Sequence, residues 1–151
     1  MDRDTEINTL VTLTTTLIDS INGYEDAAKD IDNSRFEEIF RQRASERRQV
    51  IDDLRNEIRR LGGDPPDEGS FMGKTHQRWM DLKSAVTGGD EQRIINSVEA
   101  GEDYLKEKFE TALDSGDLTG ESRQVIERAY QSVRSGHDQI SQLKHGLEAQ
   151  S

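Results

Sequence analysis

Four residues with the chemistry of metal ligands fall within the amphipathic segments of the chain: Glu25, Glu46, Glu102 and His137. A carboxylate-bridged di-iron site takes one Glu from each of two helices and a Glu-x-x-His pair from each of two others. The i, i+3 spacing turns both members of a pair toward the metals. Glu25 and Glu102 match the single glutamates, while Glu46 and His137 each match half of a Glu-x-x-His pair. A reduced iron or manganese site is therefore one interpretation.

The other halves of the two pairs are missing. Gln49 stands three residues after Glu46, where histidine is required, and Arg134 stands three residues before His137, where glutamate is required. A guanidinium is permanently charged, so it repels Fe²⁺ in a low-dielectric core. With the first turn centred near position 33, Glu25 and Glu46 are also displaced along the bundle by about five residues, roughly 7 Å. These departures argue against an intact di-iron centre.

Arg47 indicates a different use for the same carboxylates. It lies four residues before Ile51 and seven before Leu54, on the apolar stripe of its helix. A charge in that place is costly unless it is paired. The pattern therefore predicts a buried polar layer of paired charges, whose expected members are Glu25, Arg47, Glu102 and His137, with Arg134 beside them. A site for another small ligand is a third interpretation.

Four long helices have to position these residues. Apolar residues recur at intervals of three and four over about residues 4–30, 34–61, 90–114 and 121–148, which is the spacing of one helical face. Ser34 followed by Glu37 has the pattern of a capping box at the start of the second helix. Gly62-Gly63 and then Pro65-Pro66 end that helix. The sequence therefore predicts an all-α fold.

A long connection, about residues 64–89, joins two helix pairs and is predicted to contain a short fifth helix over residues 71–86. Short turns make the first and second helices antiparallel neighbours, and likewise the third and fourth. The crossover then makes the second and third helices run in the same direction, which is the layout of ferritin-like four-helix bundles. On the short helix, Trp79 and Met80 either roof the bundle or contact a protein partner.

The composition fits a single domain over residues 1–151. Apolar residues make up 31% and charged residues 34%, yet the helical periodicity persists, so thin amphipathic helices are indicated rather than disorder. The net charge of −11 argues against nucleic acid as a partner, and the absence of cysteine excludes disulfides and zinc–thiolate sites. No apolar run approaches the ~20 residues of a membrane span. Since the start of the chain also lacks a signal-peptide pattern, we expect a cytoplasmic protein.

Several motifs spread over the chain carry a family resemblance. They are Asn22-Gly23-Tyr24-Glu25, Arg60-Leu61-Gly62-Gly63, the crossover motifs Gly69-Ser70, His76-Gln77-Arg78-Trp79-Met80-Asp81-Leu82-Lys83 and Thr87-Gly88-Gly89-Asp90, then Gly101-Glu102-Asp103, and His137-Asp138. With these motifs the chain resembles a bacterial family of ferritin-like four-helix-bundle proteins of unknown function. The resemblance implies a ferritin-like fold, a soluble bacterial protein and a stress-associated setting. It implies no established activity.

Two functional hypotheses follow. The first is a non-enzymatic bundle without cofactor that acts by protein association, as a homo-oligomer. The second is a metal-binding protein of ferritin or oxidase type that holds iron or manganese through Glu25, Glu46, Glu102 and His137. The orientation of Arg47 discriminates between them. An inward, salt-bridged Arg47 favours the first hypothesis, and an outward Arg47 favours the second.

Overall fold

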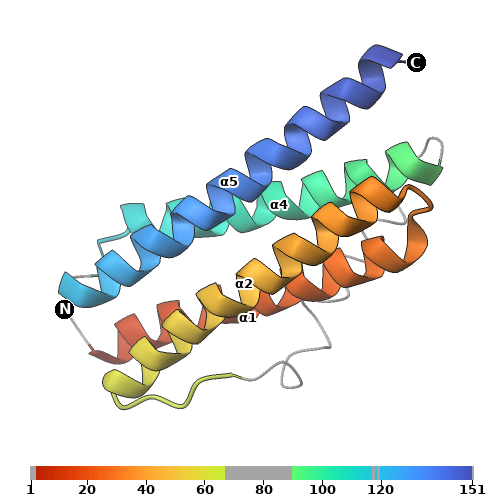
Figure 1. Ribbon diagram of the computed structural model, residues 1–151. Coiled ribbons are helices and arrows are strands. Elements are labelled where there is room, and N and C mark those ends of the chain that lie inside the picture. The colour runs from red at the N-terminus through yellow and green to blue at the C-terminus, as the bar shows by residue number, and fades with distance from the viewer. Residues whose placement is uncertain (1–2, 67–89, 117, 119, 151) are drawn as a thin grey trace.

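The computed structural model describes residues 3–66, 90–116, 118 and 120–150, and this part of the chain is a four-helix bundle without strands. The helices are α1 (Arg3–Asp30), α2 (Ser34–Arg60), α4 (Asp90–Asp114) and α5 (Gly120–Gln150), as Figure 1 shows. Their bounds agree closely with the four predicted helices. The predicted short helix over residues 71–86, with Trp79 and Met80, lies outside the described residues.

The directions of the helices follow the predicted layout. α1 and α2 form one antiparallel pair and α4 and α5 form the other, whereas α2 and α4 run in the same direction (Figure 1). Neighbouring helices contact each other as α1 with α2, α4 with α5, α1 with α4, and α2 with α5. α2 and α4 therefore face each other across the diagonal of the bundle, and a contact between them has to pass through the core.

The turn between α1 and α2 differs from the prediction in one detail. Asn33, not Ser34, is the N-cap of α2, and its Oδ1 accepts hydrogen bonds from the backbone N–H groups of Arg35 and Phe36 at 2.9 and 3.2 Å. Ser34 is already the first helical residue, so its hydroxyl cannot cap the following turn. The Glu37 carboxylate instead accepts from Arg41 one turn later, at 3.0 Å.

α2 ends at a paired-glycine turn, as predicted. Gly62 has a φ of 88°, in the left-handed region that favours glycine. Its N–H donates to the Arg59 carbonyl at 3.0 Å, and the N–H of Gly63 donates to the Ile58 carbonyl at 2.9 Å. These two hydrogen bonds form a Schellman motif, which satisfies carbonyls that would otherwise lack partners at the helix end.

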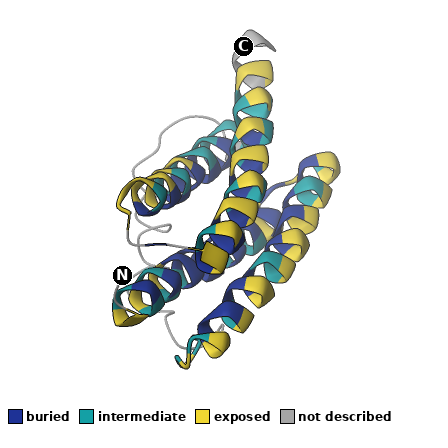
Figure 2. Cartoon of the chain, turned by 90° about the vertical axis from the view of Figure 1, so that its left-hand side faces the viewer, coloured by how far each residue is buried: buried dark blue, intermediate teal, exposed yellow. Residues whose placement is uncertain are grey.

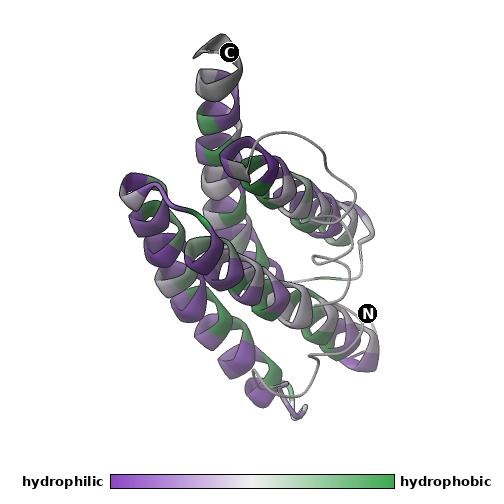
Figure 3. Ribbon diagram, turned by 90° about the vertical axis from the view of Figure 1, so that its right-hand side faces the viewer, coloured by the Kyte–Doolittle hydropathy of each residue, from purple (hydrophilic) through white to green (hydrophobic). Residues whose placement is uncertain are grey.

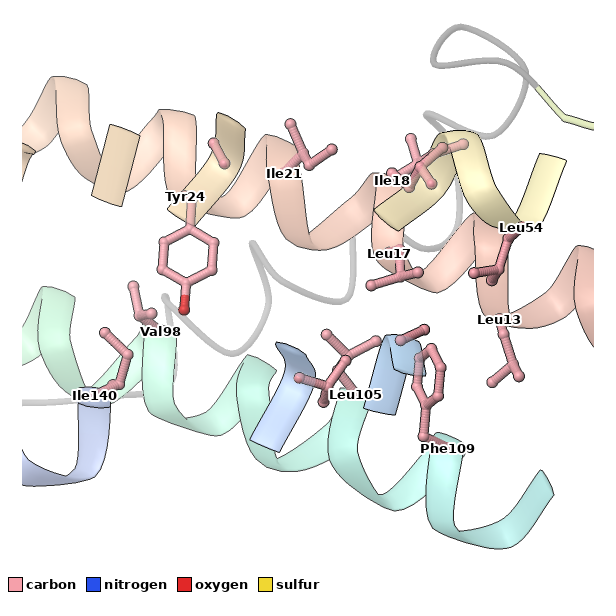
Figure 4. Packing of buried hydrophobic residues seen from close by; sticks show 14 of the residues in the cluster. Leu13, Leu17, Ile18, Ile21, Tyr24, Leu54, Val98, Leu105, Phe109 and Ile140 are labelled. Atoms are coloured by element: carbon pink, nitrogen blue, oxygen red, sulfur yellow. The ribbon is translucent and has the colours of Figure 1, made fainter. Parts of the chain in front are cut away.

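The core runs along the whole bundle. Hydrophobic side chains turn inward and hydrophilic ones outward, so buried and exposed residues alternate along each helix (Figures 2 and 3). Figure 4 shows two parts of this core: Leu13, Leu54 and Phe109 lie near one another in one part, and Tyr24, Val98 and Ile140 in the other. Within the described ranges no helix is long and apolar enough to cross a membrane.

Candidate functional site

An arginine–glutamate ion pair lies in the middle of the core. The Arg47 and Glu102 side chains are both fully buried, with 0% exposure. Arg47 Nη1 donates to Glu102 Oε1 at 2.8 Å, and Nη2 donates to Oε2 at 2.6 Å. This is the bidentate geometry in which a planar guanidinium meets both oxygens of one carboxylate. Because Arg47 is on α2 and Glu102 on α4, the pair joins the two helices that face each other across the bundle.

α1 adds two further contacts to the guanidinium. Arg47 Nη1 also donates to the Ser20 hydroxyl oxygen at 3.0 Å, and that hydroxyl donates to the Leu17 carbonyl of its own helix at 2.7 Å. The guanidinium carbon lies 5.5 Å from the centre of the Tyr24 ring, within the range of a cation–π contact. Tyr24 in turn packs against Phe40, with 5.8 Å between the ring centres.

Burial and charge act on Arg47 in opposite directions. Burial lowers the pKa of the guanidinium, but the Glu102 carboxylate beside it outweighs burial and raises this pKa above its ordinary value. For the Tyr24 phenol, burial acts in the other direction and raises the pKa well above 10.0, and the charge of Glu102 raises it further. Arg47 therefore stays charged and Tyr24 stays protonated at neutral pH.

A glycine on α5 makes room for the pair. A Cβ atom built at Gly136 would lie 2.5 Å from Arg47 Nη2 and 2.9 Å from Glu102 Oε2, closer than real Cβ atoms come to such neighbours. Glycine in a helix interior is less favourable than alanine by roughly 1 kcal/mol. Gly136 is therefore part of the layer, so all four helices contribute to it. Its sequence signal is a glycine inside a long helical pattern.

The structure places the other expected members outside the layer: Glu25 and Arg134 are at the surface, and His137 is half-buried between α5 and α4. Glu25 is 37% exposed and accepts a hydrogen bond from Arg48 at 2.6 Å. The ring of His137 lies against Asp103 on α4, with 2.5 Å between Nε2 and Oδ1, and faces Asp138 through Nδ1 at 3.3 Å. Arg134 is exposed on α5. Contrary to expectation these three stay out of the layer, because each projects from the flank or outer face of its helix.

The remaining ligand candidate, Glu46, is also exposed. It accepts hydrogen bonds from Arg43 Nη1 at 2.9 and 3.0 Å and one from the Ser132 hydroxyl. Arg43 is itself 91% buried and donates through Nη2 to Gln139 at 2.7 Å. Glu46 thus belongs to a contact between α2 and α5 at the surface, separate from the Arg47–Glu102 pair.

These donors do not fit a metal centre. Among the residues that the structure describes, no three His, Asp or Glu side chains gather closely enough to hold a metal ion. Glu102 is the one buried candidate, and both of its oxygens accept from a permanent cation. A di-iron site needs several carboxylates converging on one point, whereas Glu25, Glu46 and His137 engage different surface partners.

A family model with the description "Domain of unknown function (DUF2383)" matches residues 5–115. The chain belongs to the DUF2383 family. The matched segment includes α2 and α4 and nearly all of α1, and therefore Ser20, Tyr24, Arg47 and Glu102, but it ends before α5. No curated protein matches the chain significantly.

This DUF2383 member has a second polar cluster, near the Gly62 turn that ends α2. Arg60 donates to Glu57 through Nε at 2.8 Å and through Nη2 at 2.5 Å, and the Ser122 hydroxyl of α5 donates to Glu57 at 2.6 Å. Arg60 also meets Glu121 at 2.7 Å. The hydrogen bonds from Arg60 lower the pKa of the Glu57 carboxyl below its ordinary 4.5, although burial acts the other way. This end cluster ties α2 to α5.

Proposed function

We propose that this DUF2383 protein is a ferritin-like bundle that acts by protein association, without a resident metal and without catalysis. The ferritin-like assignment is supported by the direction of the four helices, because an antiparallel pair, a long connection and a second antiparallel pair form a single-crossover bundle. Association as a homo-oligomer and the stress-related setting implied by the family resemblance are parts of this proposal.

The observation that carries the proposal is the Arg47–Glu102 pair. A ferritin-like metal site requires carboxylates that are free to bind a cation in the core. Here the Glu102 carboxylate in the centre of the core is bound by a guanidinium that remains charged, and a second cation beside it would be repelled in a low dielectric. Arg47 supplies the positive charge that a metal would otherwise bring.

The exposed side chains of the described helices are suited to polar contacts with a protein partner. Over residues 3–66, 91–116, 118 and 120–146, every exposed residue is polar, charged or glycine. Partner binding through these exposed positions has to use hydrogen bonds and charge. Trp79 and Met80, which lie outside the described residues, remain the apolar candidates for a protein contact.

Metal content tests the proposal. The protein would be produced in medium with added iron and manganese, purified without chelator, and measured by inductively coupled plasma mass spectrometry. We expect far less than one metal ion per chain. Stoichiometric metal that disappears in the Glu102→Gln variant would overturn the proposal and support a ferritin- or oxidase-type function. The Glu25→Gln variant is the control, because Glu25 meets Arg48 at the surface.

A further inference from the structure

The outer surfaces of α2 and α5 carry two rows of side-chain amides. On α2, Gln42, Gln49 and Asn56 follow one another at intervals of seven residues, and all three are exposed. On α5, Gln124 and Gln131 are also seven residues apart and exposed. A seven-residue spacing keeps side chains on one stripe of a helix that packs in a bundle. Each helix therefore presents its amides as one row.

Contacts between the helices bring the two rows level. Ser122 binds Glu57, Ser132 binds Glu46, and Gln139 binds Arg43. Since α2 and α5 are antiparallel, this register sets Asn56 opposite Gln124 and Gln49 opposite Gln131. Gln139, which is partly buried and accepts a hydrogen bond from Arg43, lies beside the α5 row and level with Gln42, whose Nε2 donates to Glu38. We call the six residues the amide ladder. Apart from Gln92 on α4 and Gln142 and Gln150 on α5, all glutamines of the described helices belong to it.

The amide ladder lies beside an open depression of about 540 Å³ between α2 and α5. Arg43 on α2 and a group of α5 residues line it: Gln131, Arg134, Ser135, Asp138, Gln139 and Gln142. Gln131 and Gln139 of the ladder therefore border a hollow that polar side chains of a partner can enter.

The distribution of charged residues distinguishes the α2 and α5 side of the bundle from the α1 and α4 side. Together α1 and α4 contain 14 Asp and Glu against 5 Lys and Arg. Together α2 and α5 contain 10 Asp and Glu against 12 Lys and Arg. In a chain with a net charge of −11, two copies repel each other when their α1 and α4 sides approach. The α2 and α5 side is the one on which this repulsion is smallest.

We propose that the amide ladder is a self-association surface, and that its occupant is the same ladder of a second copy of the chain. A carboxamide carries both a hydrogen-bond donor and an acceptor, so a row of amides is complementary to itself. A two-fold interface requires this property, because the same patch meets its own copy. The inference rests on the proposed function and names the partner for it.

Substitutions that introduce negative charges into the amide ladder test this interface. Gln49→Glu with Gln131→Glu changes little in shape, but it places four new negative charges between two copies. The matched control is Asn8→Asp with Gln92→Glu, which adds the same charges on α1 and α4. Mass measured by light scattering after gel filtration, at 50 mM and 500 mM salt, is expected to show a dimer for wild type and control. The ladder variant is expected to be a monomer at low salt, with at least a ten-fold weaker dimerisation constant.

Gln49→Lys with Gln131→Lys decides which surface the ladder meets. If ladder meets ladder, lysines repel each other and the dimer is lost, as with glutamates. If the ladder meets the acidic α1 and α4 side, lysines strengthen association, and that result overturns the proposal. A monomeric wild type, or a ladder variant that dimerises like its control, overturns it too. Circular dichroism confirms that each variant is folded, and metal content, which tests the proposed function, is measured independently.

Discussion

Two bidentate arginine–glutamate pairs in the described part of the chain have different surroundings. Arg47 and Glu102 lie in the centre, come from different helices and are both fully buried. Arg60 and Glu57 lie three residues apart on α2, and although Glu57 is 4% exposed, the Arg60 side chain is 49% exposed. Water can replace a lost partner at the end cluster but not in the centre. The same two residue types should therefore give a large effect in the centre and a small one at the end.

The largest effect is expected for Glu102→Ala. This change leaves the Arg47 charge buried without its partner, and breaking a buried pair typically costs about 3–5 kcal/mol. Urea denaturation followed by circular dichroism at pH 7 would measure the loss. Arg47→Met should cost less, because the Glu102 carboxyl left behind can take up a proton whereas a guanidinium cannot give one up.

The double variant Arg47→Met with Glu102→Leu is the control for this pair. Replacing both charges by apolar groups of similar volume removes the desolvation cost together with the attraction. We expect a stability within about 1 kcal/mol of the wild type, or above it. A double variant as unstable as Glu102→Ala would show that volume and not charge decides the effect.

Gly136→Ala should give the next largest effect. The new methyl group would displace Arg47 Nη2 and Glu102 Oε2, and overpacking of this kind costs about 1–3 kcal/mol. Gly146→Ala on the same helix is the matched control, because nothing lies within 4 Å of its Cβ position. There alanine should be neutral or stabilising. Equal unfolding midpoints for the two variants would contradict a role for Gly136 in the layer.

Ser20→Ala should have a smaller effect of about 1–2 kcal/mol, because Arg47 Nη1 loses one buried acceptor and keeps Glu102. Ser97→Ala is a close control. Both serines are buried and donate to a carbonyl of their own helix, but the contact with Arg47 is made by Ser20. The difference between the two unfolding free energies isolates that contact, and a difference near zero would contradict it.

The smallest effect is expected at the end cluster and should depend on pH. Because the pKa of Glu57 is lower in the folded state, its ionised form stabilises the fold above the ordinary value of 4.5. This contribution is lost as the pH falls through the folded-state pKa. Glu57→Gln should therefore cost about 1 kcal/mol at pH 7 and less at pH 3.5. Denaturation curves of both proteins at the two pH values would test this, and a loss that grows toward low pH would contradict it.

The helices were predictable because each buries one stripe at regular spacing, and because glycine and proline mark the end of α2. The N-cap of α2 was not predictable, since Asn33 and Ser34 are both good N-cap residues and only the backbone shows which one precedes the helix. A shift of one residue at a helix start leaves the apolar pattern unchanged. Periodicity therefore determines the fold better than it determines the turns.

The central site was predictable in part. Arg47 stood on an apolar stripe and required an anion, and Glu102 was one of the two proposed. Glu25 could not be separated from Glu102 by spacing, because both border apolar stripes and the rotation of each helix decides which carboxylate points inward. The role of Gly136 could not be predicted for another reason. Its contribution is the space it leaves, and that space exists only where four helices meet.

The diagonal position of the Arg47–Glu102 pair has a consequence for the order of folding. Each antiparallel pair of helices can form from contacts close in sequence, whereas Arg47 and Glu102 are 55 residues apart and meet only when the two helix pairs dock. We expect the charges to stay hydrated until that late step. Arg47→Met should therefore accelerate unfolding and leave the rate of folding nearly unchanged. The buried pair would then slow the unfolding of the assembled bundle without changing how fast the bundle forms.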